Sequence, residues 1–299
     1  MTTGARNFLK GIAFVSPWLI GFGLFVLLPI VLSAYYSFHD YALIQSGPPQ
    51  PVGLANYREL AGDPLFRRAL KITFLFAAMA IPASLLVSLT LAILLNTVRL
   101  GKTAFRVIIF MPSLIPAAAA AVLWAWIFNS RSGPLALASR AINSALSIVH
   151  LHIPSPNWLA DHALPALAVM SLWSVGYTVV ILLAGLQGVP RELYEAAEID
   201  GATPLRRLWH VTLPALSPVI FFNLIMALIA SLQVFTVPTL MIKAGLRSDT
   251  QFYSMYVFDQ AFTYNHMGYA SALAWVQLLI ILALTGVAFW SSKRWVHYR

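Results

Sequence analysis

An all-helical integral membrane protein with six spanning helices is the fold that this sequence predicts. Of its 299 residues, 60% are hydrophobic and 10% are charged, and the mean hydropathy is +0.78. Soluble domains are about 45–50% apolar and about 25% charged, so this chain lacks the polar surface that a water-soluble fold needs. Six long apolar segments contain no Asp, Glu, Lys or Arg, and each exceeds the roughly 20 residues that a helix needs to cross a bilayer.

The six expected spans lie within one domain that covers residues 1–299. In chain order they are approximately 11–38, 72–96, 107–128, 163–187, 214–237 and 268–291. The uncharged stretch 141–160 is also long enough, but its Asn, Ser, His and Pro residues favour an extramembrane helix and loop. The first apolar run is longer than the roughly 7–15 residues of a signal-peptide core, so we expect a retained first helix.

The distribution of Lys and Arg predicts that both termini are cytoplasmic. An even number of spans puts both termini on one side, and the side richer in Lys and Arg is the cytoplasmic one. The segments with the higher density of cations are 1–10, 96–106, 188–213 and 291–299. One expected outer loop departs from this rule, because it carries Arg58, Arg67, Arg68 and Lys71.

Composition excludes several classes of function. The chain contains no cysteine, which excludes disulfides, thiolate catalysis and cysteine-ligated metals. Its net charge of +9 is dispersed between hydrophobic segments rather than clustered on a polar face, which argues against a nucleic-acid partner. His150 and His152 form the only metal-like pair; they lie beside Pro154 without a nearby acid, so we expect neither a metal site nor a membrane enzyme.

The expected spans carry no ionisable side chain at their centres. Secondary transporters and pumps usually place carboxylates, histidines or bases there as relays. The energy for any transport must therefore come from a partner. A buried anion would also need a buried cation to offset its desolvation, so a neutral substrate is favoured.

Prolines mark the starts and bends of several helices. Asp63 and Pro64 read as an N-cap followed by proline in the first turn of the helix that leads into the second span. Pro112 and Pro116 lie near the start of the third span, where each removes a backbone donor. They predict either a simple packing kink or a broken helix that lines a substrate path. Pro214 is expected to begin the fifth span.

The loop between the fourth and fifth spans, residues 188–213, holds all of the acids expected on the cytoplasmic side. It reads as two short helices joined by Gly201, which is suited to the positive φ of a helix C-terminus. Pro190 is expected in the first turn of the first helix, and Thr203 and Pro204 as the N-cap and first turn of the second.

The first of these short helices carries a patch of small residues, Ala196 and Ala197, between Glu195 and Glu198. Small residues allow another surface to approach the backbone closely, and the carboxylates could pair with its cations. The pattern alone fits a docking surface and a solvated amphipathic loop equally well.

The same loop resembles the EAA loop of binding-protein-dependent ABC importer permeases. The motif residues are Glu195, Ala196, Ala197, Asp200, Gly201, Leu213 and Pro214. The chain is similar to the carbohydrate-uptake branch of that family, and to the subunit type of the larger maltose permease protein. Further resemblance comes from Val52-Gly53-Leu54-Ala55-Asn56-Tyr57 and Asp63-Pro64-Leu65-Phe66, from Pro112, Pro116, Trp124 and Phe128, and from Leu183-Ala184-Gly185-Leu186-Gln187. It departs from the pattern at Val211, Leu205 and Lys243-Ala244-Gly245-Leu246-Arg247, which leaves the conformation of the outer loop 237–267 open.

The resemblance implies a type I ABC importer permease in the bacterial cytoplasmic (inner) membrane. Its implied partners are a second homologous permease subunit, two ABC ATPase subunits and an extracytoplasmic solute-binding protein. ATP and Mg would bind to the ATPase subunits, and the loop would act as a coupling helix that transmits their closure. No cofactor is expected on this chain, which also lacks a phosphate-binding G-x-x-x-x-G-K-[ST] loop.

Candidates for the substrate path are polar and aromatic residues at mid-depth of the third to fifth spans, where the resembling sugar permeases hold their substrate. They are Ser113, Trp173, Ser174, Tyr177, Ser231 and Gln233. Met170, Trp173, Ser174 and Tyr177 follow the spacing of one helical face, and the aromatic rings suit a sugar. Hydrogen bonding between helices is the alternative role for each of them.

Two other classes of function compete with an ATP-driven sugar importer. An ATP-independent secondary transporter or facilitator would move its substrate without a partner ATPase. An integral membrane enzyme would rest on the His150 and His152 pair alone.

Overall fold

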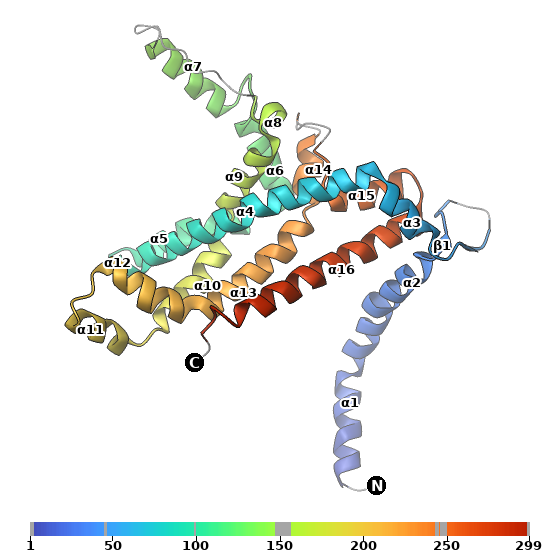
Figure 1. Cartoon of the computed structure of the whole chain (residues 1–299), viewed down its shortest axis with the longest axis horizontal. Coiled ribbons are helices and arrows are strands. Elements are labelled where there is room, and N and C mark those ends of the chain that lie inside the picture. Colours follow the sequence, from blue (N-terminus) through green and yellow to red (C-terminus); the bar gives the residue numbers. More distant parts are fainter. Residues whose placement is uncertain are drawn as a thin grey trace. The chain divides into compact units, whose positions relative to one another are not determined.

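The computed structural model describes residues 3–44, 47–98, 100–146, 157–242, 245 and 250–297. These residues are helical almost throughout (Figure 1). They also contain one two-stranded antiparallel sheet, in which β1 (His39–Asp40) pairs with β2 (Gln50–Pro51). His150, His152 and Pro154 lie outside the described residues, as do Lys243, Ala244, Leu246 and Arg247.

The first half of the chain contains two long helical stretches, one formed by α1, η1 and α2 and the other by α4, together with several shorter helices. They are α1 (Thr3–Phe22), η1 (Gly23–Leu27), α2 (Leu28–Tyr36), α3 (Ala55–Gly62), α4 (Pro64–Thr97), α5 (Lys102–Phe110), η2 (Met111–Leu114), α6 (Ala117–Ile127) and α7 (Pro134–Leu146). The second half contains α8 (Trp158–Asp161), α9 (Ala163–Trp173), α10 (Gly176–Gln187), α11 (Arg191–Ile199), α12 (Pro204–Arg207), η4 (Leu208–Thr212), α13 (Leu213–Leu232), α14 (Thr236–Ile242), α15 (Tyr253–Phe258), η5 (Asp259–Thr263) and α16 (Met267–Ser292).

Four described helices are long and apolar enough to cross a membrane. They cover Lys10–Tyr36, Pro64–Thr97, Pro204–Ile242 and Met267–Ser292. Two bent helix pairs pass the same test together, with a bend of 96° between Lys102–Leu114 and Ala117–Ile127 and of 51° between Ala163–Trp173 and Gly176–Gln187. The described residues therefore hold four such helices, or six spans if each bent pair crosses once.

The bend in the third apolar segment has a local cause. Ile115 is extended, with φ −74° and ψ 127°, because the ring of a following proline disfavours the helical conformation. Pro116 then stands at the N-cap of α6, and Met111–Leu114 form a 3₁₀ turn before the break. Of the two sequence-based alternatives, the structure has the broken helix.

The bend in the fourth apolar segment was not predicted. Ser174 leaves the helical region, with φ −101° and ψ 21°, although no proline is near. Gly176 packs so tightly that a Cβ there would lie 2.5 Å from Ser113 Oγ and 2.8 Å from the carbonyl oxygen of Ile109. The expectation that Met170, Trp173, Ser174 and Tyr177 share one face of a continuous helix is therefore wrong.

The chain divides into two compact units. One combines Met1–Pro64 with Tyr256–Leu279, and the other combines Leu65–Met255 with Ile280–Arg299. In the first unit, Gly268 N donates to Tyr41 O at 3.0 Å, and Asn265 Oδ1 accepts from the backbone N of Leu43 and Ile44 at 2.8 and 3.2 Å. The hairpin segment is thereby fixed to the start of α16.

The second unit contains two apolar clusters. One gathers side chains of α4, α6, α9 and α14 around Phe76, Leu167 and Met241. The other joins α4, α10 and α13 through Ala92, Leu182 and Leu216, all nearly without solvent exposure. These clusters hold together the helices that carry the candidate site.

Candidate functional site

The short helix α11 ends in a hydrogen-bonded turn at Gly201. Gly201 N donates to Glu198 O at 3.0 Å, and Ala202 N donates to Ala197 O at 2.9 Å. This pair of bonds closes the helix as a Schellman motif, whose glycine takes the left-handed conformation. Gly201 has φ +71°, which an L side chain adopts only with strain. The predicted positive φ of Gly201 at the end of this helix is therefore confirmed.

The chain restarts as a helix where the sequence predicts it. Thr203 is extended and its Oγ1 accepts a hydrogen bond from Arg206 N at 3.4 Å, while Pro204 occupies the first turn. Two details differ from the expectation. Pro190 stands at the N-cap of α11 rather than in its first turn. Pro214 does not begin a new helix, because α12 and η4 continue without a break into α13.

The π-helical turn η4 explains how the long helix continues through Pro214. Proline has no N–H and its ring clashes with the carbonyl four residues earlier in a regular α-helix. The wider turn over Leu208–Thr212 lies directly before α13, and such turns are frequently found where a helix is interrupted or functional. The loop is therefore joined rigidly to the helix that follows.

Two side-chain contacts attach α11 to the start of the long helix. Glu198 forms an ion pair with Arg207, and Tyr194 OH contacts Thr212 Oγ1 at 3.1 Å. Since Thr212 Oγ1 donates to Arg207 O at 3.3 Å, Tyr194 supplies the proton of its own contact. Figure 1 shows α11 beyond the ends of α10 and α13, where these contacts hold it.

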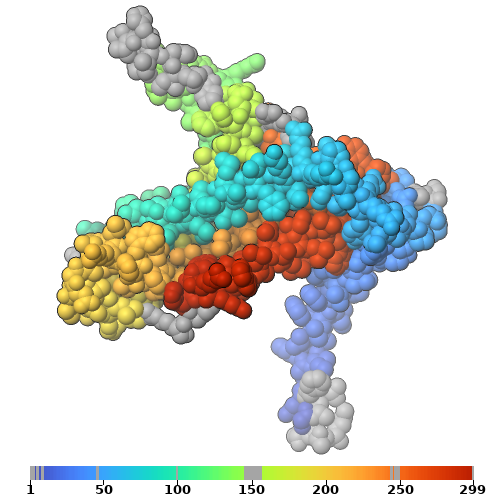
Figure 2. Space-filling view, viewed as in Figure 1, coloured from blue at the N-terminus to red at the C-terminus, as the bar shows by residue number. Residues whose placement is uncertain are grey.

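The remaining surface of this loop is open and mixed in character. Glu195, Ala196 and Asp200 are exposed. Among the apolar residues, Ile199 is 87% exposed and Leu205 is 65% exposed. Figure 2 shows this part of the chain, in yellow and orange, on the molecular surface. Exposed apolar side chains beside carboxylates are typical of a surface that binds another protein.

A cavity of about 210 Å³ lies among α4, α9, α10 and α13. Of the predicted path residues, Ser174 and Ser231 line it. Three further hydroxyl residues were not predicted: Ser84, Ser171 and Thr178. The other lining residues are apolar, and no lining residue that the structure describes is charged.

The hydroxyl groups of this cavity are arranged as hydrogen-bond acceptors. Ser84, Ser171 and Ser231 each donate their proton to a carbonyl three residues earlier in the same helix, at 3.0, 2.6 and 3.0 Å. A hydroxyl oxygen has two lone pairs besides its proton. These oxygens can therefore accept hydrogen bonds from the hydroxyl groups of a neutral ligand.

The other predicted path residues lie elsewhere. Ser113 Oγ donates to Ser174 O at 3.1 Å, so it satisfies the carbonyl group at the bend of the fourth segment. The rings of Trp173 and Trp124 are in contact, 5.9 Å apart, and Tyr177 contacts Phe110 at 4.9 Å while remaining 54% exposed. Gln233 is exposed at the C-terminus of α13. The structure does not bring these four side chains into the cavity.

Comparison with known proteins identifies the family. Residues 80–297 match the family of binding-protein-dependent transport system inner membrane components. The chain belongs to this family. The permease is 37% identical to the probable ABC transporter permease protein YesP of Bacillus subtilis (strain 168), with 98% of this chain and 93% of the relative covered. It is 30% identical to the sulfoquinovosyl glycerol transport system permease protein SmoG of Agrobacterium fabrum, over 93% of this chain and 89% of the relative.

Solved structures show the same fold for the permease. A chain of the bacterial alginate ABC transporter, crystallised with an alginate pentasaccharide-bound periplasmic protein, aligns with a TM-score of 0.79 and 21% identity. The alignment covers 97% of this chain and 96% of that one. The permease is thus a multi-pass membrane protein with the type I importer fold, as its sequence predicts.

Within the part of the chain that the structure describes, no three His, Asp or Glu side chains form a group that could hold a metal ion. His150 and His152 lie outside that part.

A half-buried carboxylate outside the predicted site links distant parts of the first unit. Asp63 Oδ2 accepts hydrogen bonds from Tyr256 OH and from Tyr269 OH, the latter at 2.7 Å. Gln260 Nε2 donates to Tyr256 OH at 3.0 Å, and His266 Nδ1 contacts Gln260 Oε1 at 3.2 Å. Burial, followed by the bond to Asp63, raises the pKa of Tyr256 to about 12. The sequence predicted Asp63 only as an N-cap and gave no signal for its tyrosine partners.

Proposed function

We propose that this permease is one of two membrane-spanning subunits of an ATP-driven sugar importer. The observation that carries the proposal is the exposed EAA loop, whose carboxylates and apolar side chains face solvent while Tyr194 and Glu198 fix it to the long helix. The names of relatives support a saccharide as substrate: SmoG is described as a sulfoquinovosyl glycerol permease, and AraP of Bacillus subtilis, 31% identical, as an arabinooligosaccharide permease.

The loop offers a direct mechanical route from a partner to the cavity. Two ATPase subunits would bind ATP and Mg and grip the surface around Glu195 and Asp200. Their closure would move α11, and the contacts of Tyr194 and Glu198 would pass that movement to the continuous helix formed by α12, η4 and α13. Ser231 lies on this same helix and lines the cavity, so closure would reshape the cavity wall.

The cavity suits a neutral, hydroxyl-rich ligand. Its serine oxygens offer acceptors, and the lining residues that the structure describes carry no charge to hold an anion. We place the substrate path beside Ser174 and Ser231. Trp173, Tyr177, Ser113 and Gln233 remain candidates for contacts along the rest of the path.

The complete transporter would contain further subunits in the bacterial inner membrane. A second homologous permease would complete the helix bundle, and an extracytoplasmic solute-binding protein would deliver the sugar. The alginate transporter supports this arrangement, because it was crystallised with a periplasmic protein. The termini and the EAA loop would face the cytoplasm, in agreement with the distribution of Lys and Arg.

ATP hydrolysis by the purified complex, compared with that of the chain alone, tests this proposal. The complex of this chain, its partner permease and two ATPase subunits should hydrolyse ATP faster when the sugar-loaded binding protein is added. The chain purified alone should hydrolyse none. Stable uptake of sugar by this chain alone, without ATP, would replace the proposal with a facilitator.

A further inference from the structure

Two prolines weaken the start of α13, directly after the EAA loop. Pro214 and Pro218 lie four residues apart in this helix, so the carbonyl oxygen of Pro214 lacks the N–H donor that the fourth following residue supplies in an α-helix. Prolines inside helices are also the commonest cause of sharp bends. We call residues 214–218 the proline joint. A rigid connection between the loop and α13 therefore needs support from another part of the chain.

Ser217 supplies the missing donor and connects the proline joint to the C-terminal end of the chain. The residue is buried, with 4% exposure, and Ser217 Oγ donates to Pro214 O at 2.7 Å. Ser217 Oγ in turn accepts a hydrogen bond from the backbone N of His297 at 2.9 Å. One hydroxyl group thus joins a carbonyl of the proline joint to a segment 80 residues further along the chain.

The C-terminal segment that reaches the proline joint is itself held in place. After α16 ends at Ser292, Val296 N donates to Ser292 O at 2.8 Å, and Val296 is buried. The rings of Trp295 and Phe221 are in contact, with centroids 5.8 Å apart, and Phe221 lies on α13 three residues beyond the joint. Figure 1 shows the end of α16 beside the start of α13, where these contacts join them.

We propose that Ser217 is a positioning residue for ATP-driven transport: its two hydrogen bonds stiffen the proline joint, so that α13 follows the movement of the EAA loop. The proposal rests on the importer function proposed above. α13 carries Ser231, which lines the hydroxyl-lined cavity among α4, α9, α10 and α13. A joint that bends would absorb the movement before it reaches this cavity wall. Ser217 therefore acts through Pro214 O and His297 N rather than through a contact with the sugar.

Variants at the two ends of the bond between His297 and Ser217 test the proposal in the assembled, reconstituted transporter. Ser217→Ala removes both hydrogen bonds of the hydroxyl group, and His297→Pro removes the backbone N–H that donates to it. Each should lower the ratio of sugar transported to ATP hydrolysed about fivefold, which corresponds to roughly 1 kcal/mol, the net size of one hydrogen bond. The double variant should be no worse than Ser217→Ala, because both changes remove the same contact.

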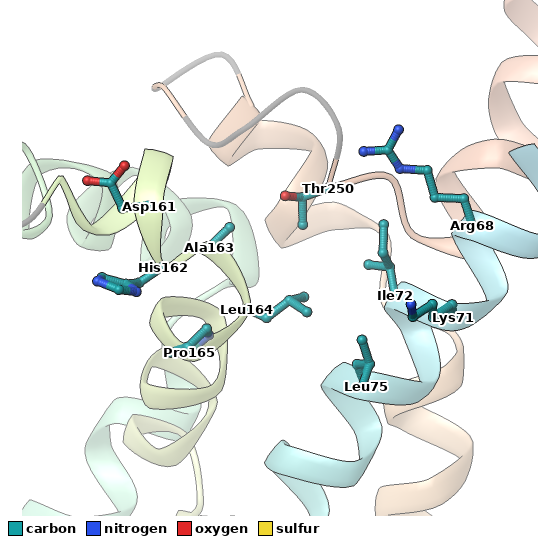
Figure 3. A pocket seen from close by; sticks show the side chains of 10 residues that line it. All are labelled: Arg68, Lys71, Ile72, Leu75, Asp161, His162, Ala163, Leu164, Pro165 and Thr250. Atoms are coloured by element: carbon teal, nitrogen blue, oxygen red, sulfur yellow. The ribbon is translucent and has the colours of Figure 1, made fainter.

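Four matched variants serve as controls. His297→Ala loses the imidazole but keeps the backbone N–H, so it should keep the parental ratio, and Ser217→Thr keeps the hydroxyl group and should retain most of it. Ser88→Ala and Thr250→Ala each remove a hydroxyl group from another buried residue of the same unit and should leave the ratio unchanged. Ser88 donates within its own helix, and Thr250 lines a separate cavity of about 450 Å³ between α4 and the corner where α8 meets α9 (Figure 3).

Hydrogen–deuterium exchange in the assembled complex measures the stiffness of the joint independently of transport. Backbone amides within residues 215–222 should exchange about fivefold faster in Ser217→Ala and His297→Pro than in His297→Ala. Equal exchange rates, or a fall in Tm with an unchanged transport ratio, would make Ser217 a purely structural residue and overturn the proposal. Equal ratios in a parent complex that transports sugar would refute the positioning role alone, whereas a parent complex that takes up no sugar with ATP would refute the importer function and the positioning role together.

Discussion

The replacement Gly201→Ala tests the backbone conformation of the EAA loop without changing its side-chain contacts. No atom lies within 4 Å of a Cβ built on Gly201, so alanine adds no steric clash. The φ of +71° is the whole source of the penalty, and a left-handed L residue costs about 1–2 kcal/mol. The closed turn at the end of α11 should therefore be populated about 5–30-fold less relative to frayed conformations.

The consequence of this loss is measurable at the interface that we propose with the ATPase subunits. We expect the affinity of the permease pair for the ATPase subunits to fall by about tenfold, which corresponds to roughly 1.4 kcal/mol. Binding-protein-stimulated ATP hydrolysis should fall with it. Microscale thermophoresis in detergent measures the affinity, and phosphate release from the reconstituted complex measures the stimulation.

Two comparison variants make the test specific. Asparagine tolerates the left-handed conformation, so Gly201→Asn should retain more of the affinity than Gly201→Ala. Gly286 also has no atom within 4 Å of an added Cβ but lies inside α16 with ordinary helical φ, so Gly286→Ala should leave coupling unchanged. If alanine and asparagine at position 201 behaved alike, or if alanine behaved as the parent, the reasoning from φ would be refuted.

Three further predictions concern the loop, the cavity and the half-buried carboxylate of Asp63. Glu195→Lys reverses the charge of an exposed residue on the proposed docking surface and should abolish uptake with normal membrane insertion; uptake in cells together with membrane immunoblots checks this, and parental uptake would contradict it. Ser231→Ala removes one acceptor from the cavity and should change the ratio of transport rates among sugars several-fold while the Tm of the complex stays near normal; a fall in Tm with unchanged selectivity would indicate a structural hydroxyl. The pKa of Tyr256 is about 12, against an ordinary value near 10, so the Tyr256 hydroxyl loses its proton at lower pH in the unfolded chain than in the folded one. The contribution of this hydroxyl to stability is therefore complete below pH 10 and is lost as the pH rises toward 12. Melting curves at pH 8 to 12 should therefore show a shallower alkaline decline for Tyr256→Phe, and an identical decline would contradict the assignment.

Features with local causes could be predicted from the sequence. The turn at Gly201, the restart at Thr203 and Pro204, and the break before Pro116 each depend on residues within one helical turn. The apolar segments were likewise readable, because hydrocarbon demands long uncharged runs.

Features created by packing between distant segments were not predictable in this way. The bend at Ser174 accompanies the close approach of Gly176 to Ser113 and Ile109. No residue near Ser174 in the sequence predicts this bend. Ser84 reaches the hydroxyl-lined cavity only because α4 packs beside α9 and α13. For the same reason, periodicity within span four placed Tyr177 on a face that the bent helix does not form.

Long-range polar contacts could not be predicted from the sequence either. Asp63 and its partners Tyr256 and Tyr269 are 193 and 206 residues apart along the chain. The sequence around a helical tyrosine does not indicate which residue accepts its hydrogen bond, so only the folded structure reveals this cluster.

Uptake by proteoliposomes tests the central claim most directly. Vesicles that contain the two permease subunits and two ATPase subunits, with ATP on the ATPase side and the binding protein on the other, should accumulate labelled sugar against its gradient. Omission of ATP, of the ATPase subunits or of the binding protein should each reduce uptake to background. Accumulation that persists in vesicles containing this chain alone, without ATP, would contradict the account.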